Sequence, residues 1–477
     1  MPVPLYVDGA FVEPEDGTYA VVNPATEELV DHAPEASASQ VAAATAAAAR
    51  AQPSWAAMPL AERTSLVAAM AGHLVDRSDE LVALVQAETG AVSWLAETQQ
   101  FRMALSYLSK WTSLEPRDFL QALLPTAGPG HRLTGAVVNR APAGVVACIT
   151  PFNFPLLTSC AMIGPALVSG NAVVLKPAPA NPLAVLALAR AADAVGLPPG
   201  VLNIVGGSSA RVGVDLVASP DVHMVSFTGS TAVGAQIASV AGRDMKRTLL
   251  ELGGKGAVLV FEDADLDLAV AGIETTWTRH AGQVCTAPTR VIAHASRYAE
   301  LLGRLEERAK AQVVGSPSDP TTTVGPLTTG AHRDRVASYV EGAGAEGGRI
   351  VAPATPLPDR GYYVAPTLVA DADPGMRIVR EEVFGPVVAA MSFRHDEEAI
   401  ALANASSYGL HDYLFSQDTS RMFDLAQQLR TGYVSVNTVA RSPEAPFGGF
   451  GASGLGRDGG LFSLQAFTEP QSIVWQA

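Results

Sequence analysis

Cys285 stands out as a candidate nucleophile. It lies three residues after Gly282, where a turn would point backbone N–H groups at the sulfur. Such surroundings lower the pKa of a thiol and favour the reactive thiolate. The alternative is a small buried hydrophobe, the ordinary state of a lone cysteine. Cys148 and Cys160 lie inside apolar runs and fit that alternative.

Glu251 and Asn153 have surroundings that also suit catalysis. Glu251 ends an apolar run before two glycines, and burial there would raise its pKa toward that of a general base working near neutral pH. The alternative is a carboxylate paired with Lys255. Asn153 lies between Pro151 and Pro155, in a loop where its amide would donate to a developing oxyanion. The alternative is a turn asparagine bonded to its own backbone.

The segment from Phe227 to Gly234 offers a candidate phosphate site. It follows an apolar run and opens a helical stretch, with Gly229, Ser230 and Thr231 at the junction. A helix N-terminus of this kind can hold a phosphate. The segment matches neither the G-x-G-x-x-G fingerprint nor a Walker A loop, so a plain helix cap explains it equally well.

Two α/β series would position these residues, with a boundary near Gly253-Gly254-Lys255. The predicted strands span residues 145–149, 172–175, 201–205 and 222–227 in the first series, and 257–261, 289–293, 387–391 and 433–436 in the second. These runs alternate little between apolar and polar residues, which is typical of parallel strands covered on both faces. Residues 132–140 and 471–475 are predicted as strands without a sheet of their own. The unpaired backbone groups of such strands can pair with a partner subunit.

Composition excludes several classes of protein. The 477 residues are 48% hydrophobic, so the chain can bury a large core and is not disordered. A net charge of −15 argues against nucleic-acid and anionic-membrane partners. The richest apolar stretch, 183–195, contains Arg190 and Asp193, so no membrane span is expected. Three cysteines without paired spacing predict neither a disulfide framework nor a metal site, and they fit the reducing cytoplasm. No secretory signal is expected at the N-terminus.

Taken together and in order, these motifs resemble those of the aldehyde dehydrogenase superfamily over almost the whole chain, from about Tyr6 to Trp475. The matching segments are Pro151-Phe152-Asn153-Phe154-Pro155, Leu175-Lys176-Pro177, Phe227-Thr228-Gly229-Ser230, Glu251-Leu252-Gly253-Gly254-Lys255, Gly282-Gln283-Val284-Cys285, Glu381-Glu382-Val383-Phe384-Gly385-Pro386 and Pro446-Phe447-Gly448-Gly449.

The resemblance implies a role for each candidate. Cys285 would attack the aldehyde carbon and form a thiohemiacetal, then a thioester. Asn153 and the backbone N–H of Cys285 would hold the oxyanion. Glu251 would activate the water that releases the acid. Expected cofactor-binding residues are Thr150, Pro151, Phe152, Lys176, Pro179, Gly229, Ser230, Leu252, Glu382 and Phe384. Expected substrate-side residues are Phe154, Leu157, Ala161, Val284, Thr286 and Phe447.

The same resemblance implies an α/β fold with a Rossmann-like dinucleotide-binding domain, a catalytic α/β domain and a small bridging β element. The expected divisions are 1–123 with 143–253 for the cofactor, 254–452 for catalysis, and 124–142 with 453–477 for oligomerisation. In this family such a bridging element builds dimers and tetramers, so a homodimer or homotetramer is expected.

Two positions depart from the common pattern. Pro179 stands where many members carry a carboxylate that binds the adenosine ribose, so NAD is expected with NADP also accepted. Gly451 stands where many carry a lysine. The apolar tunnel and Ala161, where members acting on succinate semialdehyde tend to have arginine, favour an uncharged, medium-sized aliphatic or aromatic aldehyde. Arg441 is the residue that would instead suit a carboxylated semialdehyde.

Three alternative functions remain, each of a different class. A thiol hydrolase would pair Cys285 with His280. A non-catalytic protein on this fold is disfavoured because Cys285, Glu251 and Asn153 are all present. A coenzyme-A-acylating enzyme would usually lack the Glu251 carboxylate, so its presence favours hydrolysis to the free acid.

Overall fold

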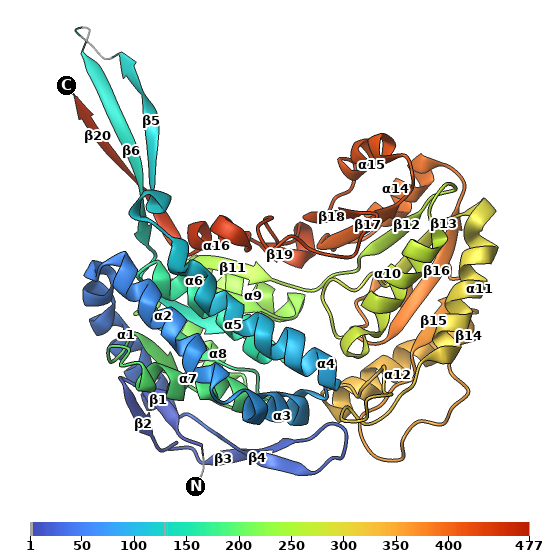
Figure 1. Cartoon of the computed structure of the whole chain (residues 1–477), viewed down its shortest axis with the longest axis horizontal. Coiled ribbons are helices and arrows are strands. Elements are labelled where there is room, and N and C mark those ends of the chain that lie inside the picture. Colours follow the sequence, from blue (N-terminus) through green and yellow to red (C-terminus); the bar gives the residue numbers. More distant parts are fainter. Residues whose placement is uncertain (1–2, 128–129, 131, 477) are drawn as a thin grey trace.

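The computed structural model describes residues 3–127, 130 and 132–476, and the parts of the expected divisions at 1–2, 128–129, 131 and 477 lie outside these residues. Two helix-covered sheets stand side by side, and a third sheet projects from the body as an arm (Figure 1). The predicted α/β class with parallel sheets is confirmed. Within the described residues, no helix is both long and apolar enough to cross a membrane.

The first sheet has eight strands in the order β19-β11-β10-β7-β8-β9-β1-β2. Its strands are β1 Leu5–Val7, β2 Ala10–Val12, β7 Val145–Ile149, β8 Ala172–Lys176, β9 Leu202–Ile204, β10 Met224–Thr228, β11 Arg247–Glu251 and β19 Gly454–Leu455. The five from β7 to β11 are parallel. Val145 and Ala147 pack toward one layer of helices, while Val146 and Cys148 pack toward the other. Burial on both faces explains the apolar runs.

The second sheet has seven strands in the order β14-β15-β16-β13-β12-β17-β18. They are β12 Ala257–Val260, β13 Arg290–His294, β14 Arg349–Val351, β15 Thr367–Ala370, β16 Val387–Phe393, β17 His411–Phe415 and β18 Tyr433–Val436. All neighbours are parallel except β14 with β15. A separate hairpin joins β3 Thr18–Val22 to β4 Leu29–Pro34.

Helices cover both faces of the two large sheets. Those of the first half are α1 Ala38–Ala57, α2 Leu60–Val75, α3 Ser78–Thr89, α4 Ser93–Leu95, α5 Met103–Ser109, α6 Pro155–Val168, α7 Leu183–Ala194, α8 Arg211–Ala218 and α9 Thr231–Arg243. Those of the second half are α10 Leu266–Thr278, α11 Ala295–Ala311, α12 Gly330–Ala345, α13 Arg377–Arg380, α14 Asp396–Asn404, α15 Thr419–Ala426 and α16 Gly460–Ala466. In the structure, a break at Asp76–Arg77 separates α2 from α3, and Gly90 ends α3 at a φ of 72°.

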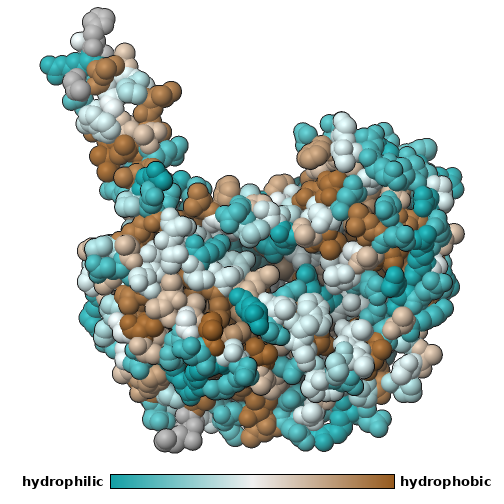
Figure 2. Space-filling model, viewed as in Figure 1, coloured by the Kyte–Doolittle hydropathy of each residue, from teal (hydrophilic) through white to brown (hydrophobic). Residues whose placement is uncertain are grey.

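The arm consists of β5 Leu120–Ala127, β6 Leu133–Pro142 and β20 Thr468–Gln476. The two strands that the sequence leaves without a sheet thus pair with each other, since β20 lies antiparallel to β6 from Thr468 to Gln476. Apolar side chains remain exposed along the arm, as the brown patches in Figure 2 show. They include Leu120, Leu123, Leu124, Leu133, Ile473, Val474 and Trp475. Gly454 and Leu455, which the sequence groups with this part, pair instead with β11 of the first sheet.

Candidate active site

Cys285 lies in a tight turn between α10 and β13. The Ala287 N–H donates to the Val284 carbonyl at 2.9 Å, so Cys285 and Thr286 occupy the centre of the turn. The chain enters it through three successive left-handed residues, His280, Ala281 and Gly282, with φ of 49°, 51° and 70°. This backbone region is rare for residues other than glycine, so the approach to Cys285 is built under conformational constraint.

The Asn153 loop is attached directly to this turn. The side-chain N–H of Asn153 donates to the Gln283 carbonyl at 2.8 Å, and the Asn153 carbonyl accepts from Gln100 at 2.7 Å. The Gln283 amide donates to His280 O, and its oxygen accepts from the backbone and hydroxyl of Thr328. All these side-chain contacts are buried. The structure therefore brings Asn153 and Cys285 together from segments about 130 residues apart.

A buried relay supports the other side of the turn. The Tyr413 hydroxyl donates to the Thr286 carbonyl at 2.8 Å and lies 3.2 Å from His411 Nδ1. Because a phenol has one hydrogen and a carbonyl only accepts, Nδ1 carries the hydrogen donated to Tyr413. Neutral His411 then accepts at Nε2 from the Ser435 hydroxyl, at 2.9 Å. Burial lowers the pKa of His411 to about 3, which keeps the ring neutral.

The pKa of the Cys285 thiol is raised, whereas its position after a glycine predicts a lowered pKa. Burial is the largest cause that raises the pKa of this thiol, the Glu251 and Glu382 carboxylates also raise it, and the net value is about 11. The guanidinium groups of Arg441 and Arg279 oppose this by favouring the thiolate. The turn alone therefore does not activate the sulfur, because loss of solvation outweighs the neighbouring positive charge.

Glu251 ends β11 in a buried position. Neither carboxylate oxygen has a hydrogen-bond partner, and no ion pair to Lys255 forms within the described residues. Burial raises the pKa of Glu251 well above its usual value, and Asp458 raises it further. Arg441 and Arg457 act in the opposite sense. An unpartnered buried carboxyl group of this kind has high proton affinity, as a general base requires.

His280 does not act on the thiol in this arrangement. Within the described residues, neither ring nitrogen has a hydrogen-bond partner, and the ring centroid lies 5.3 Å from that of Phe154. Burial lowers the pKa of His280 to about 4. The geometry therefore offers no Cys285–His280 pair for a thiol hydrolase.

Lys176, at the end of β8, is the main charged group on the candidate cofactor side. Its side chain is buried and donates one hydrogen bond, to Pro177 O at 3.3 Å. Since an ammonium has three donors, this one has capacity left for a polar ligand. Burial lowers its pKa to about 8. Pro179, two residues after Pro177, is partly exposed. Thr150, after β7, is tied to the same edge because its N–H donates to Lys176 O at 3.1 Å.

The loop before α9 lies beside these groups. Ser230 caps α9 by accepting from Val233 N–H at 3.4 Å, and the Gly229 N–H donates to Glu251 O at 3.1 Å. Leu252 follows and donates its N–H to Ser453 O at 3.0 Å. The carboxyl ends of parallel strands and a helix N-terminus are where dinucleotides bind, so these residues fit such a cofactor.

Glu382 and Phe384 complete the cofactor side from the second sheet. Glu382 Oε1 accepts from the Gly254 N–H at 2.9 Å. Phe384 has a φ of 59°, and its ring lies 5.7 Å from that of Phe152. His332 Nε2 donates to the Phe384 carbonyl at 2.8 Å, since that oxygen only accepts.

The candidate substrate side is largely apolar. Leu157 and Ala161 are partly exposed one turn apart on α6, which starts directly after the Asn153 loop. The Arg441 guanidinium lies 3.5 Å from the Phe447 ring centre. Val284 and Thr286 are buried on either side of Cys285. Gly451 has a φ of 55°, in the left-handed region, and a Cβ built there would lie 2.8 Å from Ser407 O.

Gln283, His332 and Tyr413 form contacts at the site that the motifs did not assign. For Tyr413 the available signal was a run of three polar residues, His411 to Tyr413, between apolar neighbours. Arg279 precedes the left-handed approach, and among the described residues its buried Nε has no hydrogen-bond partner.

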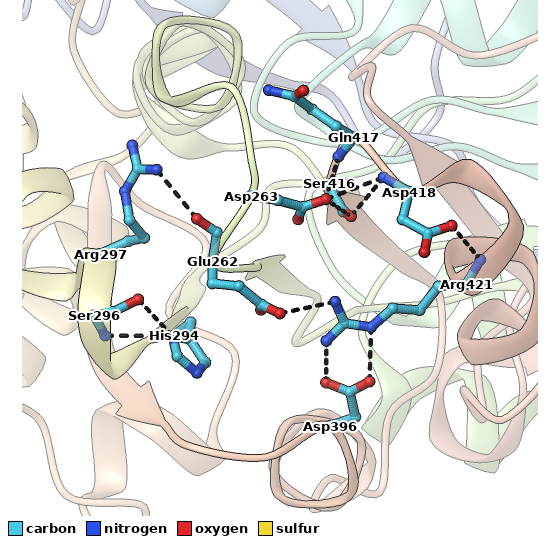
Figure 3. A network of polar contacts seen from close by, with 10 residues as sticks. All are labelled: Glu262, Asp263, His294, Ser296, Arg297, Asp396, Ser416, Gln417, Asp418 and Arg421. Carbon is cyan, nitrogen blue, oxygen red and sulfur yellow. Dashed lines mark hydrogen bonds and ion pairs between the residues drawn. The ribbon is translucent and has the colours of Figure 1, made fainter.

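The far edge of the second sheet is occupied by a polar network instead (Figure 3). Asp263 accepts from Ser416 and from the Gln417 and Asp418 N–H groups, and Arg421 pairs with Glu262 and Asp396. These contacts, all made to one oxygen of Asp263 and to both carboxylates around Arg421, hold the loops after β12 and β17. The candidate site therefore lies at the opposite, amino end of β13.

Comparisons with known proteins agree with this geometry. A model of the aldehyde dehydrogenase family matches residues 11–473. The chain is 37% identical to a 3-succinoylsemialdehyde-pyridine dehydrogenase from Pseudomonas sp., over 98% of both chains. It is 35% identical to a glutarate-semialdehyde dehydrogenase from Pseudomonas aeruginosa, over 97% of this chain and 95% of the relative. The structure of PnpE in complex with nicotinamide adenine dinucleotide superposes with a TM-score of 0.93 at 37% identity, covering 100% of this chain and 98% of the other.

Proposed function

The chain belongs to the aldehyde dehydrogenase family, and from this we propose that it oxidises an aldehyde to the carboxylic acid with Cys285, Asn153 and Glu251 as its catalytic residues. It is an oxidoreductase of the aldehyde group and uses NAD. The observation that supports this site is the hydrogen bond of 2.8 Å from the Asn153 amide to Gln283 O, two residues before Cys285.

The chemistry begins at the Cys285 sulfur. The thiolate attacks the carbonyl carbon, and the aldehyde oxygen becomes an oxyanion as the C–S bond forms. The Asn153 amide and the Cys285 N–H donate to this oxygen. Bound NAD would supply the hydride acceptor for this step, and loss of hydride from the tetrahedral carbon would leave a thioester on Cys285.

Glu251 completes the reaction by taking a proton from water as the water attacks the thioester carbon. The C–S bond breaks, the acid leaves, and Cys285 recovers its thiolate. The raised pKa of Glu251 supports this role, because a carboxylate with high proton affinity is the stronger base.

The cofactor would lie along the carboxyl edge of the first sheet. Lys176 and Glu382 would bind ribose hydroxyls, and Ser230 with Gly229 would hold the pyrophosphate at the start of α9. Phe384 and Phe152 would flank the nicotinamide. Thr150, Pro151, Pro179 and Leu252 would line the remainder of this site.

We propose an uncharged, medium-sized aldehyde as substrate, because Phe154, Leu157 and Ala161 offer no charge to a carboxylate. A carboxylated semialdehyde is the second candidate. It is favoured by the position of Arg441 over Phe447, and by the name of the glutarate-semialdehyde relative. A panel of aldehydes with NAD, followed by absorbance of the reduced cofactor, tests the function. No turnover with any of them would contradict it.

The partner proposal is a second copy of this chain. The exposed apolar residues of the arm support a homodimer or homotetramer. The proposed oligomerisation segments are 124–142 and 453–477, apart from Gly454 and Leu455, which pair with the first sheet. The proposed cofactor-binding domain is 1–123 with 143–253, and the proposed catalytic domain is 254–452. Three free cysteines fit a cytoplasmic location.

A further inference from the structure

Glu35 brings a carboxylate to the loop after β9, at the carboxyl edge of the first sheet, whereas Pro179 offers no charge there. We propose that Glu35 is the residue by which this enzyme discriminates NAD from NADP, through repulsion of the 2′-phosphate. The inference rests on the proposed cofactor site, and it replaces the weak discrimination that Pro179 alone predicts.

Two hydrogen bonds fix Glu35 to the loop after β9. It follows β4, and the N–H of the next residue, Ala36, donates to Gly206 O at 3.0 Å. The Ser208 N–H donates to Glu35 Oε2 at 2.8 Å. Gly207 lies beside the other oxygen, since a Cβ built there would be 3.1 Å from Oε1. The carboxylate is therefore held at one place.

The Glu35 carboxylate lies on the side of the first sheet where its parallel strands end, and Lys176 is the last residue of β8. β8 and β9 are parallel neighbours, with Leu175 opposite Ile204, so the residues after both strands emerge at the same edge. Gly213 on α8 lies along the lysine side chain, and a Cβ there would be 3.8 Å from its Cδ. This carboxyl edge is where open parallel sheets bind dinucleotides.

The charges at this edge favour a hydroxyl over a phosphate. Glu35 is the charged group that acts on Lys176, whose pKa it raises against the lowering caused by burial. Among the described residues, no ion pair joins the two and the one hydrogen bond of the Lys176 ammonium goes to Pro177 O, so this group keeps donors for a ligand. A 2′-hydroxyl can donate to the carboxylate, whereas a 2′-phosphate would be repelled by it. Arg211, the nearby cation on α8, is occupied by Asp16 at 2.6 Å and does not offset this repulsion.

The test measures nucleotide binding by isothermal titration calorimetry on the full-length protein. The wild type should bind NADP at least about tenfold more weakly than NAD, because the phosphate faces a fixed carboxylate. Glu35→Gln keeps an oxygen for the Ser208 N–H and removes the charge. It should tighten NADP binding about tenfold and leave NAD within about threefold. Glu28→Gln, an exposed change of equal charge on the same hairpin, should leave both affinities unchanged.

A second measurement needs no variant. Adenosine 2′,5′-bisphosphate should bind the wild type more weakly than 5′-AMP. Equal binding of these two probes, or an unchanged NADP-to-NAD ratio in Glu35→Gln, would overturn the role of Glu35. Absence of binding by every nucleotide would instead reject the proposed cofactor site.

Discussion

The Tyr413 hydroxyl and the Thr286 carbonyl oxygen are 2.8 Å apart, which ties β17 to the residue directly after Cys285. Tyr413→Phe should remove this bond and keep the ring. We expect kcat to fall roughly fivefold with KM little changed, since one buried hydrogen bond is worth about 1 kcal/mol and acts here on the position of the sulfur. Steady-state kinetics measure the split. Tyr298→Phe, which loses a comparable bond on α11, is the control and should retain wild-type kcat.

Cys285→Ser should abolish dehydrogenase turnover, because a serine hydroxyl provides no comparable nucleophile at neutral pH. Cys148→Ser and Cys160→Ser are the matched controls, since both cysteines are buried in the first sheet's core. The controls should retain most of the activity. Near-normal rates in Cys285→Ser would reject the proposed nucleophile.

Glu251→Gln should slow hydrolysis of the thioester more than its formation. Rapid mixing would then give a burst of reduced cofactor followed by a slow steady state. If the burst disappears together with the turnover, Glu251 acts before the thioester, most simply on Cys285.

Alkylation of Cys285 by iodoacetamide in the absence of nucleotide should accelerate with pH. The pKa of the thiol is about 11, so the protonated form dominates below it and the thiolate fraction rises roughly tenfold per pH unit between pH 7 and 10. Arg441→Gln should slow alkylation at each pH, because the guanidinium favours the thiolate. Arg394→Gln, exposed and distant in the sequence, serves as control. A rate that is flat from pH 7 to 10 would contradict the raised pKa.

A comparison of uncharged aldehydes with a carboxylated semialdehyde distinguishes the two candidate substrate classes. Benzaldehyde and hexanal should have higher kcat/KM than succinate semialdehyde, because the tunnel residues on α6 carry no charge. If the order is reversed and Arg441→Gln selectively depresses the semialdehyde, the guanidinium over Phe447 binds a carboxylate.

Much of the architecture follows from local sequence, because strands buried on both faces must be apolar throughout. β18 has the predicted bounds, Tyr433–Val436, and β7 those predicted for residues 145–149. The pairing of Asn153 with Cys285 in one site came from motif resemblance and stays a prediction, which the hydrogen bond from Asn153 to Gln283 O supports. The Tyr413 relay and Glu35 were not predictable, because each acts through a residue distant in sequence. The prediction of a lowered pKa for Cys285 was wrong, because the loss of solvation depends on how distant segments pack around the sulfur.

The left-handed entry to the nucleophile turn has a mechanical consequence. Gly282 lies against the backbone carbonyl of Gly385, the residue after Phe384, so closely that no side chain fits between them. A side chain at position 282 would push the nucleophile turn away from the segment that carries Phe384. The close approach of the proposed catalytic and cofactor sides therefore depends on the absence of a single Cβ.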